Sequence, residues 1–252
     1  MIVLNEHDWA ADAIESRTLG KQPFETLHRV ARYYLDEGYP KREVRRLLDA
    51  FVLQCDAKAS LPKWSEVIDC ALDRASKYNA LCVDYIPVTK TELERIGRLD
   101  GVQLPRLAFT LLVLAKYWDL VNPVGDHWVN SPDNEIMRMA NINTSTRRQS
   151  MLYAWLRDAG MIQFSKKVDN TNVRVCFIDS GETAMKISDF RSLGYQYLKY
   201  RGEPFFECAN CGLIVRMTEP NKGRRQVYCK SCAAEIATQQ RVNSVMRMRQ
   251  PA

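Results

Sequence analysis

Four cysteines near the carboxyl end of the chain have the spacing of metal ligands. They form two Cys-x2-Cys pairs separated by seventeen residues, at Cys208, Cys211, Cys229 and Cys232. Two tight turns of this kind can present four thiolates tetrahedrally to one ion, and zinc is the ion that such a set predicts. Because four thiolates leave no open coordination position, we expect the zinc to be structural rather than catalytic.

The residues around these cysteines predict a small metal-stabilised module. Gly212 follows the second cysteine, where a turn of this type often needs the positive backbone angle that glycine adopts readily. Residues 213–216 and 226–228 are short apolar runs that we expect to pair as a hairpin. The segment resembles zinc-ribbon and treble-clef modules. A chance spacing, or a set of redox dithiols, is the alternative interpretation of the four cysteines.

Residues 131–160 have the pattern of two helices joined by a short turn. Ser131 followed by proline is typical of a helix start. Residues 141–143 form the expected turn, and Asn143 or Thr144 can cap the second helix. The expected buried stripe of that helix consists of Met151, Leu152, Trp155, Leu156 and Ala159. Helix, three-residue turn and helix is the spacing of a helix-turn-helix.

Two runs of alternating apolar residues follow, over residues 161–164 and 173–178. We expect them to pair as a hairpin across a polar, basic loop. Together with the two preceding helices, residues 134–162 resemble winged helix-turn-helix DNA-binding domains, including those of phage and plasmid replication and regulatory proteins. The resemblance covers about a third of the chain.

The resemblance implies which residues contact DNA. In such folds the amino-terminal half of the second helix enters the major groove. The residues at that position are Ser145, Thr146, Arg147, Arg148 and Gln149. The residues expected to reach phosphate or the minor groove from the wing are Lys166, Lys167 and Arg174. In the zinc segment, Arg224 and Arg225 are candidates for a second nucleic-acid contact, since clustered cations gain from counterion release.

The other elements are read from apolar spacing. The first twenty residues show no clear period, and three amphipathic helices are expected over residues 23–37, 40–55 and 62–75. Thr89 and Glu92 match a capping box that begins a short helix. The later helices are expected over residues 104–120, where apolar density predicts a central buried helix, and over residues 184–193.

These elements predict a mainly helical protein of the α+β class. Its expected parts are a helical bundle over residues 1–82, a winged helix-turn-helix over residues 83–180, and a helical linker with the four-cysteine zinc module and a basic tail over residues 181–252. The amino-terminal bundle is a candidate docking site for a protein partner, and a homodimer is a candidate assembly.

Composition and charge narrow the class of protein. The chain is 46% hydrophobic and 26% charged, and it has no apolar tract of the roughly 18 residues that a membrane span needs. The amino terminus lacks the pattern of a secretory signal, so we expect a cytoplasmic protein without a membrane partner. Four further cysteines stand singly among apolar neighbours and are expected to be buried thiols: Cys55, Cys70, Cys82 and Cys176.

No catalytic motif stands out in the sequence. The chain has no phosphate-binding loop, no His-Glu-x2-His and no Gly-x-Ser-x-Gly, and its three histidines are far apart, so we do not expect an enzyme. Glu92 and Glu94 are better explained by helix capping and solvation than by acid-base chemistry.

The sequence therefore predicts a protein that binds double-stranded DNA, as a transcriptional regulator or a replication accessory. The combination of parts resembles proteins carried by bacterial phages and related mobile elements. One alternative is an adaptor or inhibitor that docks a protein through the winged helix. Another is an RNA-binding protein that stacks bases on the aromatic side chains between residues 195 and 206.

Overall fold

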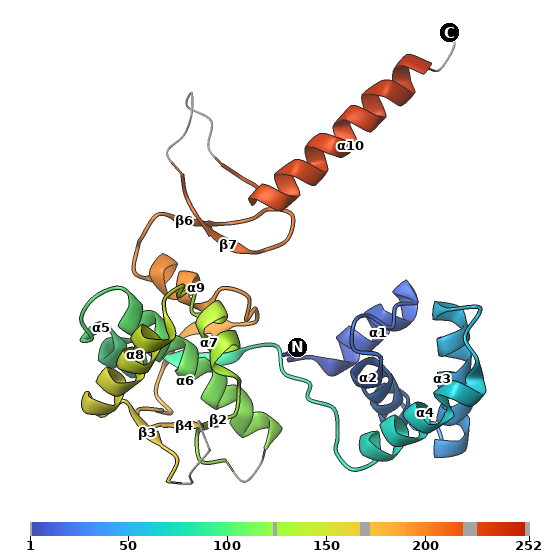
Figure 1. Cartoon of the computed structure of the whole chain (residues 1–252), viewed down its shortest axis with the longest axis horizontal. Coiled ribbons are helices and arrows are strands. Elements are labelled where there is room, and N and C mark those ends of the chain that lie inside the picture. The colour runs from blue at the N-terminus through green and yellow to red at the C-terminus, as the bar shows by residue number, and fades with distance from the viewer. Residues whose placement is uncertain (1, 123–124, 167–171, 219–225, 250–252) are drawn as a thin grey trace. The chain divides into compact units, whose positions relative to one another are not determined.

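A computed structural model of the chain describes residues 2–122, 125–166, 172–218 and 226–249, with side chains described as far as residue 244. The chain folds into two compact units, Met1–Tyr85 and Ile86–Ala252 (Figure 1). Helices predominate and the sheets are small, which confirms the mixed α+β class. The division into three parts at residues 82 and 180 stays a prediction.

The amino-terminal unit is a bundle of helices with one shared core. Its described helices are α1 (Glu6–Ser16), α2 (Pro23–Asp36), α3 (Lys41–Cys55) and α4 (Leu61–Ala75). Buried apolar side chains from all four meet in that core. The first of these helices was missed in the sequence because its buried residues, Ala10 and Ala13, are too small to produce a strong apolar period.

A buried polar cluster lies beside this core. Glu6 forms ion pairs with Arg29 and Arg32, and its carboxylate also accepts a hydrogen bond from the Leu81 N–H at 3.1 Å. His28 is buried next to them, 2.8 Å from a guanidinium nitrogen of Arg32. Because the arginine can only donate, the imidazole nitrogen that faces it accepts. His28 is therefore held in its neutral form.

We expect this histidine to make the amino-terminal unit sensitive to acid. Burial, and then the positive charges of Arg32, Arg74 and Arg29, lower the pKa of His28 from 6.5 to about 3. Between these two pH values the unfolded chain binds a proton that the folded chain does not, so stability falls as the pH falls. In His28→Gln the amide oxygen still accepts from Arg32 but does not titrate. The unfolding temperature should therefore fall more steeply between pH 7 and pH 4 in the wild type than in His28→Gln. Equal slopes of unfolding temperature against pH would contradict a neutral, buried His28.

The carboxyl-terminal unit is built around one buried helix. The helices before its four-cysteine segment are α5 (Lys90–Gly97), α6 (Gln103–Val121), α7 (Asp133–Met139), α8 (Thr146–Asp158) and α9 (Leu193–Tyr200). Side chains of α6 are fully buried on several sides, including Phe109, Leu111, Leu112 and Leu114. This confirms the predicted central helix.

Two small sheets flank these helices. The strands are β1 (Ile86–Thr89), β2 (Trp128–Val129), β3 (Ile162–Phe164), β4 (Val173–Val175) and β5 (Thr183–Ile187). The predicted hairpin is confirmed, since β3 pairs antiparallel with β4, with Ile162 opposite Val175 and Phe164 opposite Val173. On its other edge β4 pairs with β2, so the sheet order is β2, β4, β3.

The prediction of a helix over residues 184–193 was wrong. Residues Thr183–Ile187 form β5, which pairs antiparallel with β1 so that Ile187 lies opposite Ile86. Both of these isoleucines are buried. Pairing with a strand almost a hundred residues earlier determines that this segment is a strand. The period of apolar residues within the segment cannot reveal such a partner.

The expected burial of the four single cysteines was also wrong. Cys55 is partly buried, whereas Cys70, Cys82 and Cys176 are exposed. Apolar neighbours in the sequence do not bury a residue if it projects from the other side of its element. In α4, for example, Ile68 points into the core and Cys70 does not.

Glu92 joins α5 to two other segments of this unit. The capping box is present, and in it the Thr89 N–H donates a hydrogen bond of 2.8 Å to a Glu92 carboxylate oxygen. The same oxygen pairs with Lys116 Nζ of α6 at 2.7 Å, and the other accepts from the Asp179 N–H at 2.8 Å. Capping is confirmed, but Glu92 is fully buried rather than solvated because it satisfies donors from all three segments.

Candidate metal centre

The four cysteines of the predicted metal set come together at one point. Cys208 and Cys211 lie in the connection between β6 (Phe205–Glu207) and β7 (Ile214–Arg216). Cys229 lies just before α10 (Lys230–Arg249), and Cys232 lies in its first turn. The four sulfur atoms all lie within 4.8 Å of one another. Two segments that are distant in the sequence thus supply two ligands each.

The spacing of the sulfur atoms is compatible with tetrahedral coordination of one ion. A tetrahedron with metal–sulfur bonds of about 2.3 Å has sulfur–sulfur edges of about 3.8 Å. The Sγ atoms of Cys211 and Cys229 are 3.8 Å apart. Cys208, Cys229 and Cys232 are buried and Cys211 is partly buried, so the site is closed to additional ligands. The four cysteines could hold a metal ion.

Hydrogen bonds orient the sulfur atoms and tune their pKa values. The Cys229 N–H donates to Cys208 Sγ at 3.2 Å, and chiefly for this reason the pKa of Cys208 is lowered to about 6. The Ser231 hydroxyl, 3.2 Å from Cys229 Sγ, is the main cause of a lowered pKa at Cys229. These two thiols ionise readily, as metal ligands must.

The pKa of the fourth thiol reflects the crowding of the sulfur atoms. Asn210 donates to Cys232 Sγ and lowers its pKa, but Cys229, burial and the other two thiols outweigh this effect. The pKa of Cys232 is consequently raised to about 12. Four neighbouring thiolates repel one another, and a bound cation removes that penalty.

The backbone around the cysteines differs in one respect from the expectation. Gly212 has the predicted positive φ of 71°, and its N–H donates to the Cys208 carbonyl at 2.9 Å. In the part of the chain that the structure describes, β7 pairs with β6 and residues 226–228 form no strand, so the structure does not show the expected hairpin between residues 213–216 and 226–228. Among the described residues, Val227 reaches this region by accepting from the Ala209 N–H at 3.1 Å.

The DNA-contact residues predicted on the second helix lie at the start of α8. Ser145 caps the helix by accepting from the Arg148 N–H at 3.4 Å, so neither Asn143 nor Thr144 is the cap. The side chains of Ser145, Thr146, Arg147 and Arg148 are exposed, and Gln149 is partly buried. The connection to α7 spans residues 140–145 and is longer than the expected three-residue turn.

The buried face of α8 is rotated from the expected stripe. Its buried side chains are Leu152, Tyr153 and Leu156, whereas Met151 and Trp155 are 39% and 38% exposed. The Tyr153 hydroxyl donates to an Asp133 carboxylate oxygen at 3.1 Å, which joins α8 to the first turn of α7. Burial is the main cause of a raised pKa at Tyr153, so this hydroxyl stays protonated. A polar anchor, rather than apolar spacing alone, orients the helix.

Contacts with α6 and α9 hold the connection before α8, and sequence reasoning missed them. The Asn141 carbonyl accepts from Arg106 at 2.9 Å, and the Asn141 side chain accepts from the Tyr195 N–H at 3.1 Å. Gly194 approaches so closely that a side chain there would clash with the Ala140 carbonyl. The only sequence signal that could have found this contact is the glycine within α9.

The remaining predicted contact residues have separate environments. Lys166 is exposed near the end of β3. Arg174 is held on β4 by Asp126, whose carbonyl accepts at 2.9 Å and whose carboxylate lies at 3.3 Å. The other three, Lys167, Arg224 and Arg225, lie outside the described residues.

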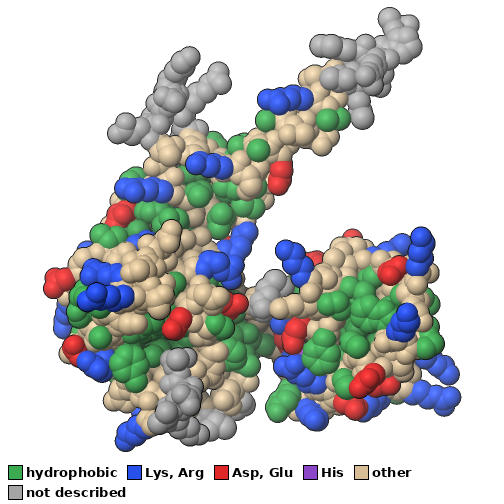
Figure 2. All heavy atoms as spheres, viewed as in Figure 1, with side chains coloured by type: hydrophobic (Ala, Val, Ile, Leu, Met, Phe, Trp, Pro, Cys, Tyr) green, Lys and Arg blue, Asp and Glu red, His purple; other side chains and the backbone are tan. Residues whose placement is uncertain are grey.

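The positive charge of the chain belongs to one unit. Residues 86–252 contain 24 lysines and arginines against 16 acidic residues, whereas residues 1–85 contain 12 against 14. Figure 2 shows Lys and Arg side chains on the surfaces of both units, so the units differ in the balance with acidic residues. The excess favours an anionic partner for that unit.

Comparisons of the chain with protein-family models, curated proteins and solved structures gave no match. Within the part of the chain that the structure describes, no helix is both long and apolar enough to cross a membrane. The features of the chain that bear on its function are the four-cysteine cluster, the exposed start of α8 and the charge distribution.

Proposed function

We propose that the chain binds double-stranded DNA and that the start of α8 enters the major groove. The order α6, α7, α8, β3, β4, with β2 on the other edge of β4, supports a winged-helix interpretation of this unit. In that arrangement α8 is the recognition helix and the β3–β4 connection is the wing. A transcriptional regulator or a replication accessory of a phage or mobile element is the role that we propose for it.

The observation that carries this proposal is the exposed pair of arginines in the first turn of α8. Among the described residues, neither Arg147 nor Arg148 forms an ion pair with a carboxylate. By contrast, Arg157 of the same helix pairs with Asp158 at 2.7 Å. Unpaired guanidinium groups beside a serine and a threonine suit both phosphate and base edges.

We propose further that the four-cysteine cluster holds zinc in a structural role. Four thiolates in a closed tetrahedral set are typical of structural zinc. The hydrogen bond from the Cys229 N–H to Cys208 Sγ joins the segment just before α10 to the connection between β6 and β7, so the ion would stabilise this end of the unit. The exposed residues 238–244 of α10 would then project from a rigid base.

The DNA-binding proposal is tested by fluorescence titration against random-sequence duplex DNA, single-stranded DNA and single-stranded RNA at two salt concentrations. We expect preferential, salt-dependent binding to the duplex. The double variant Arg147→Ala with Arg148→Ala should bind the duplex at least about tenfold more weakly, with a shallower salt dependence. A matched control is Arg42→Ala with Arg46→Ala, which removes two exposed charges from α3 of the other unit.

Duplex binding by the α8 double variant that equals the wild type would overturn the recognition-helix assignment. Stronger binding to single-stranded RNA would favour the RNA-binding alternative. Absence of binding to all three nucleic acids would favour a protein-binding adaptor or inhibitor.

A further inference from the structure

The two arginines at the start of α8 face different directions. Successive residues of an α-helix are about 100° apart around its axis, so neighbours cannot share a face. Arg147 is followed at helical spacing by Ser150, Met151 and Ala154, which lie on the side away from the buried Leu152. Arg147 therefore lies on the exposed face of α8, where a binding partner can contact it.

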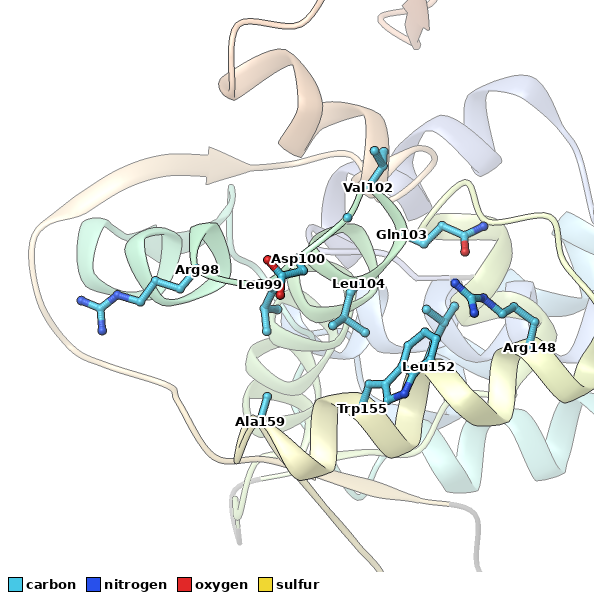
Figure 3. Close-up of a pocket in the computed structure, with 11 residues that line it drawn as sticks. Arg98, Leu99, Asp100, Val102, Gln103, Leu104, Arg148, Leu152, Trp155 and Ala159 are labelled. Atoms are coloured by element: carbon cyan, nitrogen blue, oxygen red, sulfur yellow. The ribbon is translucent and has the colours of Figure 1, made fainter.

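Arg148 belongs instead to the side of the helix that lines a groove. On α8 the groove is lined by Arg148, Leu152, Trp155 and Ala159. The opposite wall is the connection between α5 and α6 together with the first residues of α6, over residues 98–104, and the volume is about 510 Å³. In Figure 3 Arg148 and Trp155 point toward one another, whereas Arg98 points away from the groove. Arg148 is thus directed sideways along α8.

A cation–π contact holds Arg148 in this direction. Its guanidinium carbon lies 4.4 Å from the centroid of the Trp155 ring. Such a contact at an exposed site favours one direction of a long side chain. The contact places the guanidinium carbon over the indole ring, and among the described residues no carboxylate pairs with Arg148, so its N–H groups remain available to an acceptor. This also gives a reason for the exposure of a tryptophan on α8.

We propose that Arg147 reads bases in the major groove and that Arg148, positioned by Trp155, binds a phosphate at the edge of that groove. This inference rests on the proposed DNA binding. A base contact distinguishes sequences, whereas a phosphate contact adds affinity and salt dependence equally for all sequences. Trp155 is a positioning residue, because it acts through the direction of Arg148.

The test is selection from a random-sequence duplex library, with sequencing of the bound DNA, followed by salt titration on the most enriched duplex. Arg147→Ala should flatten the enriched motif, with a loss of discrimination of about 5- to 150-fold at the affected base pair. Arg148→Ala should keep the motif, weaken binding to all duplexes by a similar factor, and reduce the logarithmic salt slope by about 1.

Two variants of Trp155 separate positioning from packing. Trp155→Phe keeps an aromatic face beneath the guanidinium, so it should retain most of the affinity and the salt slope. Trp155→Leu keeps an apolar side chain without that face, so its duplex affinity and its salt slope should both fall toward those of Arg148→Ala. Thermal unfolding of each variant confirms that the fold is retained.

Several results would overturn the proposed division of roles between Arg147 and Arg148. They are a changed motif in Arg148→Ala, an unchanged motif in Arg147→Ala, or equal behaviour of Trp155→Leu and Trp155→Phe. Failure of the wild type to bind any duplex would overturn the DNA-binding proposal together with this one. A wild type that selects a motif while the arginine variants behave alike would overturn only the division of roles.

Discussion

Cys229→Ser is expected to reduce the zinc content from one ion per chain to none and to unfold the segment around β6 and β7. Cys229 supplies one of the four sulfurs, and its N–H orients a second, Cys208, at 3.2 Å. Binding of a structural zinc is coupled to folding, so the two pairs of cysteines lose their connection together with the ion. Metal analysis of the purified protein measures the first effect. Amide hydrogen exchange over residues 205–216 measures the second.

A matched control is available in the same unit. Cys176 is exposed and lies outside the cluster, so Cys176→Ser should leave both zinc content and exchange unchanged. Removal of zinc from the wild type by a chelator should reproduce the exchange pattern of Cys229→Ser. Stoichiometric zinc in Cys229→Ser, or a wild type purified from zinc-containing medium without the ion, would refute the structural zinc site.

Glu92→Ala is expected to lower the free energy of unfolding of the carboxyl-terminal unit by about 3–5 kcal/mol. The substitution leaves the ammonium group of Lys116, only 12% exposed, without its carboxylate. It also removes the acceptor for the N–H groups of Thr89 and Asp179. Urea denaturation followed by circular dichroism measures the loss. The chain has two compact units, so we expect two unfolding transitions, of which only that of the carboxyl-terminal unit should shift.

Two comparison variants locate the cause of this loss. Glu94 is exposed on the same helix, so Glu94→Ala should change the free energy of unfolding by no more than about 0.5 kcal/mol. Glu92→Leu combined with Lys116→Met removes both charges and should recover part of the stability lost in Glu92→Ala. A loss below about 1 kcal/mol in Glu92→Ala would mean that the buried pair contributes little.

The amino-acid sequence alone was sufficient for features whose chemistry is local. The spacing within each Cys-x2-Cys pair, the capping box at Thr89 and Glu92, and the apolar density of α6 all depend on residues within a few turns of one another. The alternation that predicted the pairing of β3 with β4 is also local, because one short loop joins the two strands. These predictions were confirmed for that reason.

Features that depend on distant partners were decided by the tertiary structure. Thr183–Ile187 is a strand because β1 lies beside it, and Glu92 is buried because Lys116 and Asp179 reach it. The orientation of α8 follows the same principle. A periodic pattern allows more than one rotation of a helix, and Tyr153 bonded to Asp133 is part of what selects one of them.

The sequence by itself therefore determined the four-cysteine set, the main helices and the identity of the basic residues at the start of α8. Only the tertiary structure decided that the four sulfurs meet within 4.8 Å, that Trp155 is exposed beneath Arg148, and that Gly194 packs against Ala140. The physical reason is that residue type and short-range spacing fix which groups are available. Packing between segments far apart in the chain fixes where those groups point.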